Sequence, residues 1–310
     1  TRPTLLWLRR DLRVADHPGW EAALALGGPV IPVFVLDPVI ERTYGAAPRW
    51  RLERALEAHA EALAARGSRL VLRRGPALEA LRALVAETGA GRVVWSRQYE
   101  REARARDTEV KAALKADGVE AVSVNSALLF EPWTVETTEG SYYKVYTPFW
   151  KAVRGAELAE PLPAPSDLAP PEDWPASDRL GDWQLGRAMN RGAEVVARHA
   201  IVGEDAAWER FRRFRDEAIG RYKADRDRLD LDATSRMSQA LSFGEISARA
   251  LWHEGWDAVR RLSGEAATGA ETFVSELVWR EFAYHLLYHT PQIEDENWRE
   301  EWDAFPWAED

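Results

Sequence analysis

Five short apolar runs in the first third of the chain constrain its fold more than any other feature. They read TLLWL, PVIPVFVLD, SRLVLRRG, RVVWS and EAVSVN, and apolar and polar residues do not alternate strictly along them. Stretches rich in Ala, Leu, Glu and Arg separate the runs, and we predict helices at 49–66, 77–88 and 100–116. Strands that are apolar on both faces and joined by single helices predict a parallel, Rossmann-like sheet covered by helices on both sides.

The rest of the chain differs in composition and in predicted secondary structure. Six prolines fall among acidic and small residues at 157–180, which indicates a stiff, extended surface connector. Strand patterns end near residue 194, and helices are predicted at 204–221, 238–254 and 271–288. The sequence therefore predicts an α/β domain at 1–130, a connector at 131–194 and an all-α domain at 195–310.

The composition narrows the classes of protein to consider. A chain of 310 residues is long enough for two hydrophobic cores, and no run approaches the roughly 18 apolar residues of a membrane-spanning helix. Cysteine is absent, so neither disulfides nor zinc–thiolate sites are expected, and we predict no metal site and a cytoplasmic location. The net charge of −10 argues against non-specific adhesion to nucleic acid, although a local basic groove remains compatible with it.

The stretch LDATSRMSQALSFGEIS gathers hydroxyl side chains and an arginine where a helix is predicted to begin. Thr234, Ser235 and Ser238 supply hydroxyl groups, and Arg236 supplies a positive charge. Unpaired backbone N–H groups and the helix dipole make such a helix start attractive to phosphate. The ordinary alternative is a doubled N-cap beside an exposed arginine.

A second stretch, TFVSELVWREFAYHLLYHTP, places polar groups on one side of a very apolar helix. Glu276, Trp279 and Arg280 are spaced i, i+3 and i+4, so all three share one face. That arrangement suits a polar pocket within a helical core. The alternative is an ordinary Glu–Arg pair next to a tryptophan that packs in the core.

Read together with two further segments, these stretches resemble the DNA photolyase/cryptochrome family. LLWLRRDLRVADHPGW resembles the opening of that family, and YYKVYTPFWKA resembles its segment entering the connector. RYKADRDRLDLDATSRMSQALSFGEIS resembles the flavin-phosphate loop, and ELVWREF resembles the most characteristic helix. The four motifs occur in the family's order across nearly the whole chain. The resemblance implies an α/β antenna domain followed by a helical domain that binds FAD.

Several residues acquire cofactor roles through this resemblance. The residues implied to bind FAD are Tyr222, Thr234, Ser235, Arg236, Met237, Ser238, Phe273 and Arg280. An antenna chromophore, methenyltetrahydrofolate or a deazaflavin, is implied in the α/β domain, with Glu109 as its ligand or, alternatively, as an exposed helix acid. We expect Arg9, Arg10 and Arg13 to be structural or to lie at the domain interface.

The resemblance further implies light-driven repair of DNA by a deoxyribodipyrimidine photolyase, a carbon–carbon lyase that splits cyclobutane pyrimidine dimers. The catalytic residues would be Glu276, which hydrogen-bonds the dimer, and Trp279, which packs against it. The expected partner is UV-damaged DNA with the dimer flipped out of the duplex. We expect a monomer that does not associate with membranes.

Members of the family continue well beyond the FPW motif that lies near the end of this chain. The continuation supplies the adenine side of the flavin pocket, so we expect either a fragment or an incomplete flavin site, and a fragment is the better interpretation. Three alternatives stay open: a cryptochrome-type blue-light photoreceptor without repair activity, repair of the (6-4) photoproduct, and a non-catalytic nucleotide-binding module.

Overall fold

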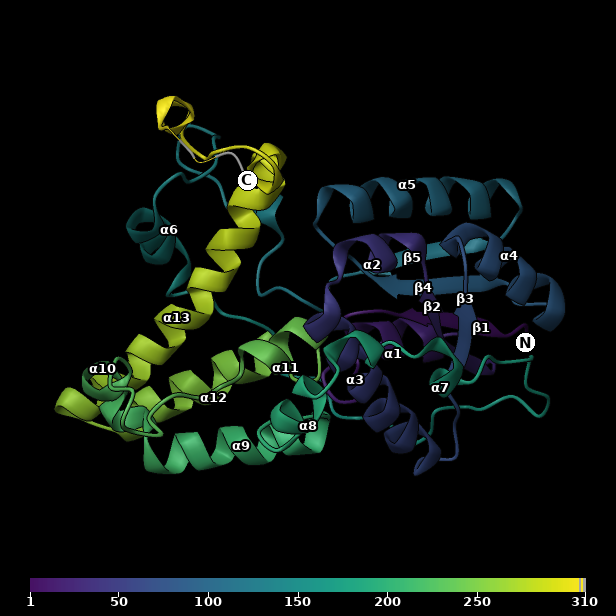
Figure 1. The fold of residues 1–310 in the computed structure, drawn as a ribbon, viewed down its shortest axis with the longest axis horizontal. Coiled ribbons are helices and arrows are strands. Elements are labelled where there is room, and N and C mark those ends of the chain that lie inside the picture. The colour runs from purple at the N-terminus through teal and green to yellow at the C-terminus, as the bar shows by residue number, and fades with distance from the viewer. Residues whose placement is uncertain (307, 309–310) are drawn as a thin grey trace.

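The computed structural model describes residues 1–306 and 308, and within them one sheet of five parallel strands forms the N-terminal part (Figure 1). The strands are β1 (Thr4–Leu8), β2 (Val30–Leu36), β3 (Val71–Arg74), β4 (Arg92–Ser96) and β5 (Glu120–Val124). Their order across the sheet is β3-β2-β1-β4-β5, and every neighbouring pair is parallel. The predicted parallel sheet is confirmed, and each apolar run contributes one strand.

Helices cover both faces of this sheet. They are α1 (Pro18–Leu24), α2 (Pro38–Thr43), α3 (Ala46–Ala64), α4 (Ala77–Thr88) and α5 (Arg101–Ala116). Because side chains alternate along a strand, Leu6 and Leu8 pack with α1 and α3, whereas Leu5 and Trp7 pack with α4 and α5. The two hydrophobic cores therefore lie on opposite faces of the sheet, as the apolar strands predicted.

The proline-rich part of the connector runs back over the α/β part of the chain. Its helical pieces are η1 (Pro132–Thr134), α6 (Tyr146–Val153), α7 (Leu180–Trp183), η2 (Arg187–Met189) and α8 (Gly192–Ala197). The proline-rich stretch is extended, as predicted, but it is also tied down. Val30 donates a backbone hydrogen bond of 2.8 Å to the carbonyl of Ala169, and the neighbouring Leu168 is fully buried. The segment is therefore part of the fold and not a free spacer.

The remaining described elements are helical, as predicted. They are α9 (Glu204–Glu217), η3 (Ile219–Arg221), α10 (Tyr222–Asp225), α11 (Ser238–Phe243), α12 (Ala248–Arg261), α13 (Gly264–His289), η4 (Pro291–Glu294) and η5 (Glu300–Ala304). Phe211, Phe214, Leu251, Val274 and Val278 lie in their shared core. Among residues 1–306 and 308, none of the helices is long and apolar enough to span a membrane.

One predicted helix is wrong: 238–254 is interrupted between α11 and α12. Gly244 ends α11 with φ +67°, a left-handed conformation that favours glycine. A Cβ atom at this position would lie 2.2 Å from the carbonyl oxygen of Arg10, so the α/β part approaches the backbone here too closely for any side chain. Ser247 then caps α12 by accepting hydrogen bonds from the backbone N–H groups of Arg249 and Ala250.

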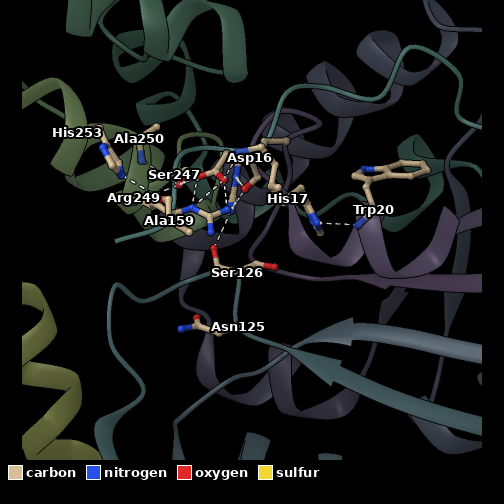
Figure 2. A network of polar contacts seen from close by, with 12 residues as sticks. Asp16, His17, Trp20, Asn125, Ser126, Ala159, Ser247, Arg249, Ala250 and His253 are labelled. Carbon is tan, nitrogen blue, oxygen red and sulfur yellow. Dashed lines mark hydrogen bonds and ion pairs between the residues drawn. The ribbon is translucent and has the colours of Figure 1, made fainter. Parts of the chain in front are cut away.

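Polar contacts join the two parts of the chain at this break (Figure 2). Asp16 accepts hydrogen bonds from Arg249, 3.0 Å from Nε, and from the hydroxyl of Ser247. The buried guanidinium of Arg13 donates across the interface to the carbonyl of Gly244 at 3.0 Å, and within the α/β part to the carbonyls of Asp16 and Ser126 at 2.8 and 2.7 Å. The interface role expected for Arg13 is confirmed.

The other two arginines that follow β1 also have structural partners. Arg9 is buried, lies over the ring of Trp7 and pairs with Asp107 at 2.7 Å. Arg10 donates to the carbonyl of Ser242 at 2.7 Å and pairs with Glu100 at 2.6 Å, which links it to the helical part. These side chains lie at the carboxyl ends of β1 and β4, the two strands between which the strand order reverses. Open α/β folds usually bind ligands at this place.

Candidate functional site

A cavity of about 490 Å³ lies in the helical part, beside α13 and the loop that precedes α11. Its lining includes nine of the residues named from the sequence, which come from segments far apart in the chain: Tyr222, Thr234, Ser235, Arg236, Met237, Ser238, Phe273, Glu276 and Arg280. Trp279 and Glu109 do not line it. The structure therefore brings both polar stretches together around one space.

The loop before α11 and the first residue of that helix present free hydroxyl groups to the cavity. Within residues 1–306 and 308, the hydroxyls of Thr234 and Ser238 make no hydrogen bond, so both are available to a ligand. Arg210 of α9 holds the loop in shape by bonding the carboxylate of Asp232 at 2.7 and 2.9 Å and the carbonyl of Thr234. Sequence reasoning missed Arg210, because nothing local marks an arginine that acts across 22 residues of chain.

The hydroxyl groups do not act as helix caps. Met237 occupies the N-cap position of α11 without a capping side chain, and it is buried in the core. α11 has only six residues, so its dipole is small, and the expected contribution of a long helix is not present. Attraction for an anion depends instead on the hydroxyls and on the guanidinium groups of Arg10, Arg236 and Arg280, which also line the cavity.

The acid in the cavity wall has a partner that the sequence did not reveal. Glu276 pairs with Arg226, which lies just after α10. Arg280 pairs with the next residue, Glu281, at 2.8 Å, and its guanidinium lies over the ring of Tyr284. The simple alternative of a Glu276–Arg280 pair is therefore not what the structure shows.

Trp279 lies outside the cavity, one helical turn from Glu276. Trp279 is 45% exposed, which is high for a tryptophan, and its ring stacks on Tyr146 of α6. The ring centroids are 3.6 Å apart and the planes differ by 10°. The sequence predicted one shared face for Glu276, Trp279 and Arg280. In the structure Glu276 and Arg280 line the cavity, whereas Trp279 does not.

Two buried titratable groups on α13 hold the connector and the residues that lead into it. Glu281 accepts a hydrogen bond of 2.7 Å from the backbone N–H of Leu129, and burial raises its pKa to about 7 although Arg280 opposes the shift. His285 accepts from the backbone N–H of Tyr143 at 3.0 Å, and burial lowers its pKa to about 4 with a contribution from nearby His289. These contacts fix the connector against the helix that carries Glu276 and Trp279.

The lining of the cavity suits a dinucleotide such as FAD. Its volume falls within the range of about 300–1,000 Å³ typical of ligand pockets. Hydroxyls and arginines at one side match phosphate groups, and Phe273, Leu251 and Leu277 supply an apolar wall for a ring system. Within the described residues, no cluster of His, Asp and Glu could hold a metal ion.

The antenna residue proposed from the sequence stands apart from this site. Glu109 lies on the exposed side of α5 and does not line the cavity beside that helix, which has a volume of about 250 Å³. Its role as a chromophore ligand stays a prediction.

Known proteins are similar to this chain in sequence and in fold. The family model of DNA photolyase matches residues 4–166, and that of the FAD binding domain of DNA photolyase matches residues 273–310. A deoxyribodipyrimidine photo-lyase of Agrobacterium fabrum is 39% identical over all of the chain and 64% of its own length. Cryptochrome-1 of Arabidopsis thaliana is 28% identical over 99% of the chain and 46% of its own length. A solved bacterial class III photolyase from Agrobacterium tumefaciens is 38% identical with a TM-score of 0.94, again over all of the chain and 64% of the other.

Proposed function

Because the chain belongs to the DNA photolyase family, we propose that it acts in light-driven DNA repair as a lyase that splits cyclobutane pyrimidine dimers. The observation that carries this proposal is the placement of Glu276 in the wall of the cavity, one helical turn from the exposed ring of Trp279. The chain spans 64% of the length of the Agrobacterium relatives, so the activity of these relatives is carried to it as a proposal.

The cavity is proposed to hold FAD. Thr234, Ser238 and Arg236 would bind its pyrophosphate, and Phe273 would pack against its rings. When bound in its reduced form, FAD supplies light-driven one-electron chemistry. An antenna chromophore, a folate or a deazaflavin, is proposed for the α/β part with Glu109 as a ligand.

The residues of α13 are proposed to receive the damaged bases. A base flipped out of a duplex needs a ring to stack on and a polar partner for its edge. Trp279 offers an exposed indole, and Glu276 offers a carboxyl group at the cavity wall. Arg226 would keep that carboxyl group oriented until the dimer enters.

Local charge supports DNA as the partner. The segment 141–156 contains Lys144, Lys151 and Arg154 and no acidic residue, in a chain whose net charge is −10. The same segment carries Tyr146, which stacks on Trp279. Of these cations, Arg154 lies 3.9 Å from Glu271, and Lys144 and Lys151 are proposed to neutralise backbone phosphates next to a flipped dimer.

The proposal is tested with purified protein, reduced flavin and an oligonucleotide that contains one thymine dimer. We expect a flavin absorption band that stays with the protein through gel filtration, and restored thymines after blue light but not in the dark. Bound flavin with intact dimers would favour the blue-light photoreceptor, and repair of a (6-4) substrate instead would replace the proposed lesion. A colourless protein with affinity for adenine nucleotides would favour the non-catalytic module.

A further inference from the structure

The connector contributes a ring to the surface on which the dimer is proposed to stack. Tyr146 begins α6, and its ring lies parallel to the indole of Trp279 with 3.6 Å between centroids. The tyrosine hydroxyl donates to the carbonyl of Ser275 at 2.6 Å and lies 2.7 Å from the hydroxyl of the same residue. Ser275 lies one turn before Trp279 on α13. The ring and the hydroxyl group of Tyr146 therefore both contact this helix.

This contact leaves the indole with one open face. Tyr146 covers one side of the ring, and Phe282 meets Trp279 edge-on at a centroid distance of 5.9 Å and an angle of 77°. Trp279 nevertheless is 45% exposed, and within the described residues no other ring lies against the indole, so we infer that its opposite face is accessible. An exposed tryptophan without such support would sample several rotamers and lose that freedom when a base binds.

We propose that Tyr146 is a positioning residue that holds the indole of Trp279 in place, so that one flipped base stacks on its free face. This inference rests on the proposed function, since it assigns the stacking surface of the same site. Tyr146 itself touches no base, because the indole lies between them, and its effect on binding should therefore depend on Trp279.

The test measures dark binding of the flavin-loaded protein to an oligonucleotide with one thymine dimer and to the undamaged duplex. For Tyr146→Leu we expect affinity for the dimer to fall about tenfold, with little change for the undamaged duplex. Tyr146→Phe keeps the stack and should retain most of the affinity. At saturating substrate, the repair rate under light should change little, because the loss lies in binding.

Tyr142 provides a matched control from the same connector segment. Its ring stacks on His289, with centroids 4.8 Å apart and planes at 6°, away from Trp279. Tyr142→Leu should therefore bind the dimer as the wild type does. Equal losses in Tyr142→Leu and Tyr146→Leu would overturn the inference, because they would indicate a general loosening of the connector.

A double-mutant cycle decides whether the tyrosine acts through the tryptophan. If it does, Tyr146→Leu has no further effect on dimer affinity once Trp279→Ala is present, and an independent, additive loss would overturn the inference. Binding is measured without light, so it does not depend on repair. A wild type that binds the dimer but leaves it intact would contradict the proposed reaction, while the variants would still decide the role of Tyr146.

Discussion

At the scale of single residues, the most specific prediction concerns the role of Glu276 in the reaction. Its carboxyl group lines the cavity and pairs with Arg226, and both side chains are about a third exposed, so water can solvate Arg226 when Glu276 turns to a ligand. Glu276→Gln should lower the number of dimers repaired per absorbed photon several-fold and weaken dimer binding less. Glu271→Gln on the same helix is the control, since Glu271 lies 3.9 Å from Arg154 and outside the cavity. Equal losses of yield and binding in Glu276→Gln would contradict a role in the reaction.

The residues of this site differ in how far the sequence could reveal them. Thr234 and Ser238 were predictable because hydroxyls cluster within a few positions, and both line the cavity. Arg226 and Tyr146 were not, because their importance comes from contacts across 50 and 133 residues of chain, with Glu276 and Trp279. Tyr146 and Trp279 are thus 133 positions apart in the sequence. Local pattern shows which chemistry a segment offers, whereas its partners depend on packing.

At the scale of elements, α13 carries two buried groups, Glu281 and His285, that hold neighbouring segments. Their pKa values are shifted in opposite directions. The pKa of Glu281 is raised to about 7, so between about pH 4.5 and 7 the folded protein holds a proton that the unfolded chain has lost. Its contribution to the free energy of unfolding therefore decreases as the pH rises. The pKa of His285 is lowered to about 4, so its contribution increases between about pH 4 and 6.5.

Glu281→Gln separates these two effects. The glutamine can still accept the hydrogen bond from Leu129 but no longer titrates. Relative to the wild type, the variant should gain free energy of unfolding as the pH rises from 4.5 to 7, by up to about 3 kcal/mol. Denaturant unfolding at pH 4.5, 5.5 and 7 measures this difference, and a difference that does not vary with pH would contradict the raised pKa.

The break between α11 and α12 shows where element prediction failed. The apolar periodicity of 238–254 is compatible with one long helix, and glycine within such a pattern often costs only about 1 kcal/mol. Gly244 ends the helix because the carbonyl of Arg10 lies against it, and Arg10 belongs to a different part of the fold. The sheet, in contrast, was predictable, since its inner strands β1, β2 and β4 are buried on both faces and carry that information locally.

At the scale of the whole molecule, the α/β and helical parts share a buried polar interface. Arg51 of α3 pairs with the fully buried carboxylate of Glu245, which also accepts a hydrogen bond of 2.8 Å from the backbone N–H of Gly203. Leu12 donates to the carbonyl of Phe243 at 3.1 Å, directly before the glycine that ends α11. Buried charges require their partners, so separation of the two parts would be costly, and we expect them to unfold together.

Gly244→Ala tests this coupling. Alanine would be strained at φ +67°, and its Cβ would meet the backbone of Arg10 and Asp11, which forces the two parts apart. Gly264→Ala is the matched control, because Gly264 has φ +58° and open space around it. We expect the control to lose about 1 kcal/mol of unfolding free energy and Gly244→Ala about 2–5 kcal/mol. In scanning calorimetry, the single transition expected for the wild type should split in Gly244→Ala and stay single in Gly264→Ala. Equal destabilisation without splitting would mean that backbone strain alone explains the glycine and that the close approach of the two parts does not hold them together.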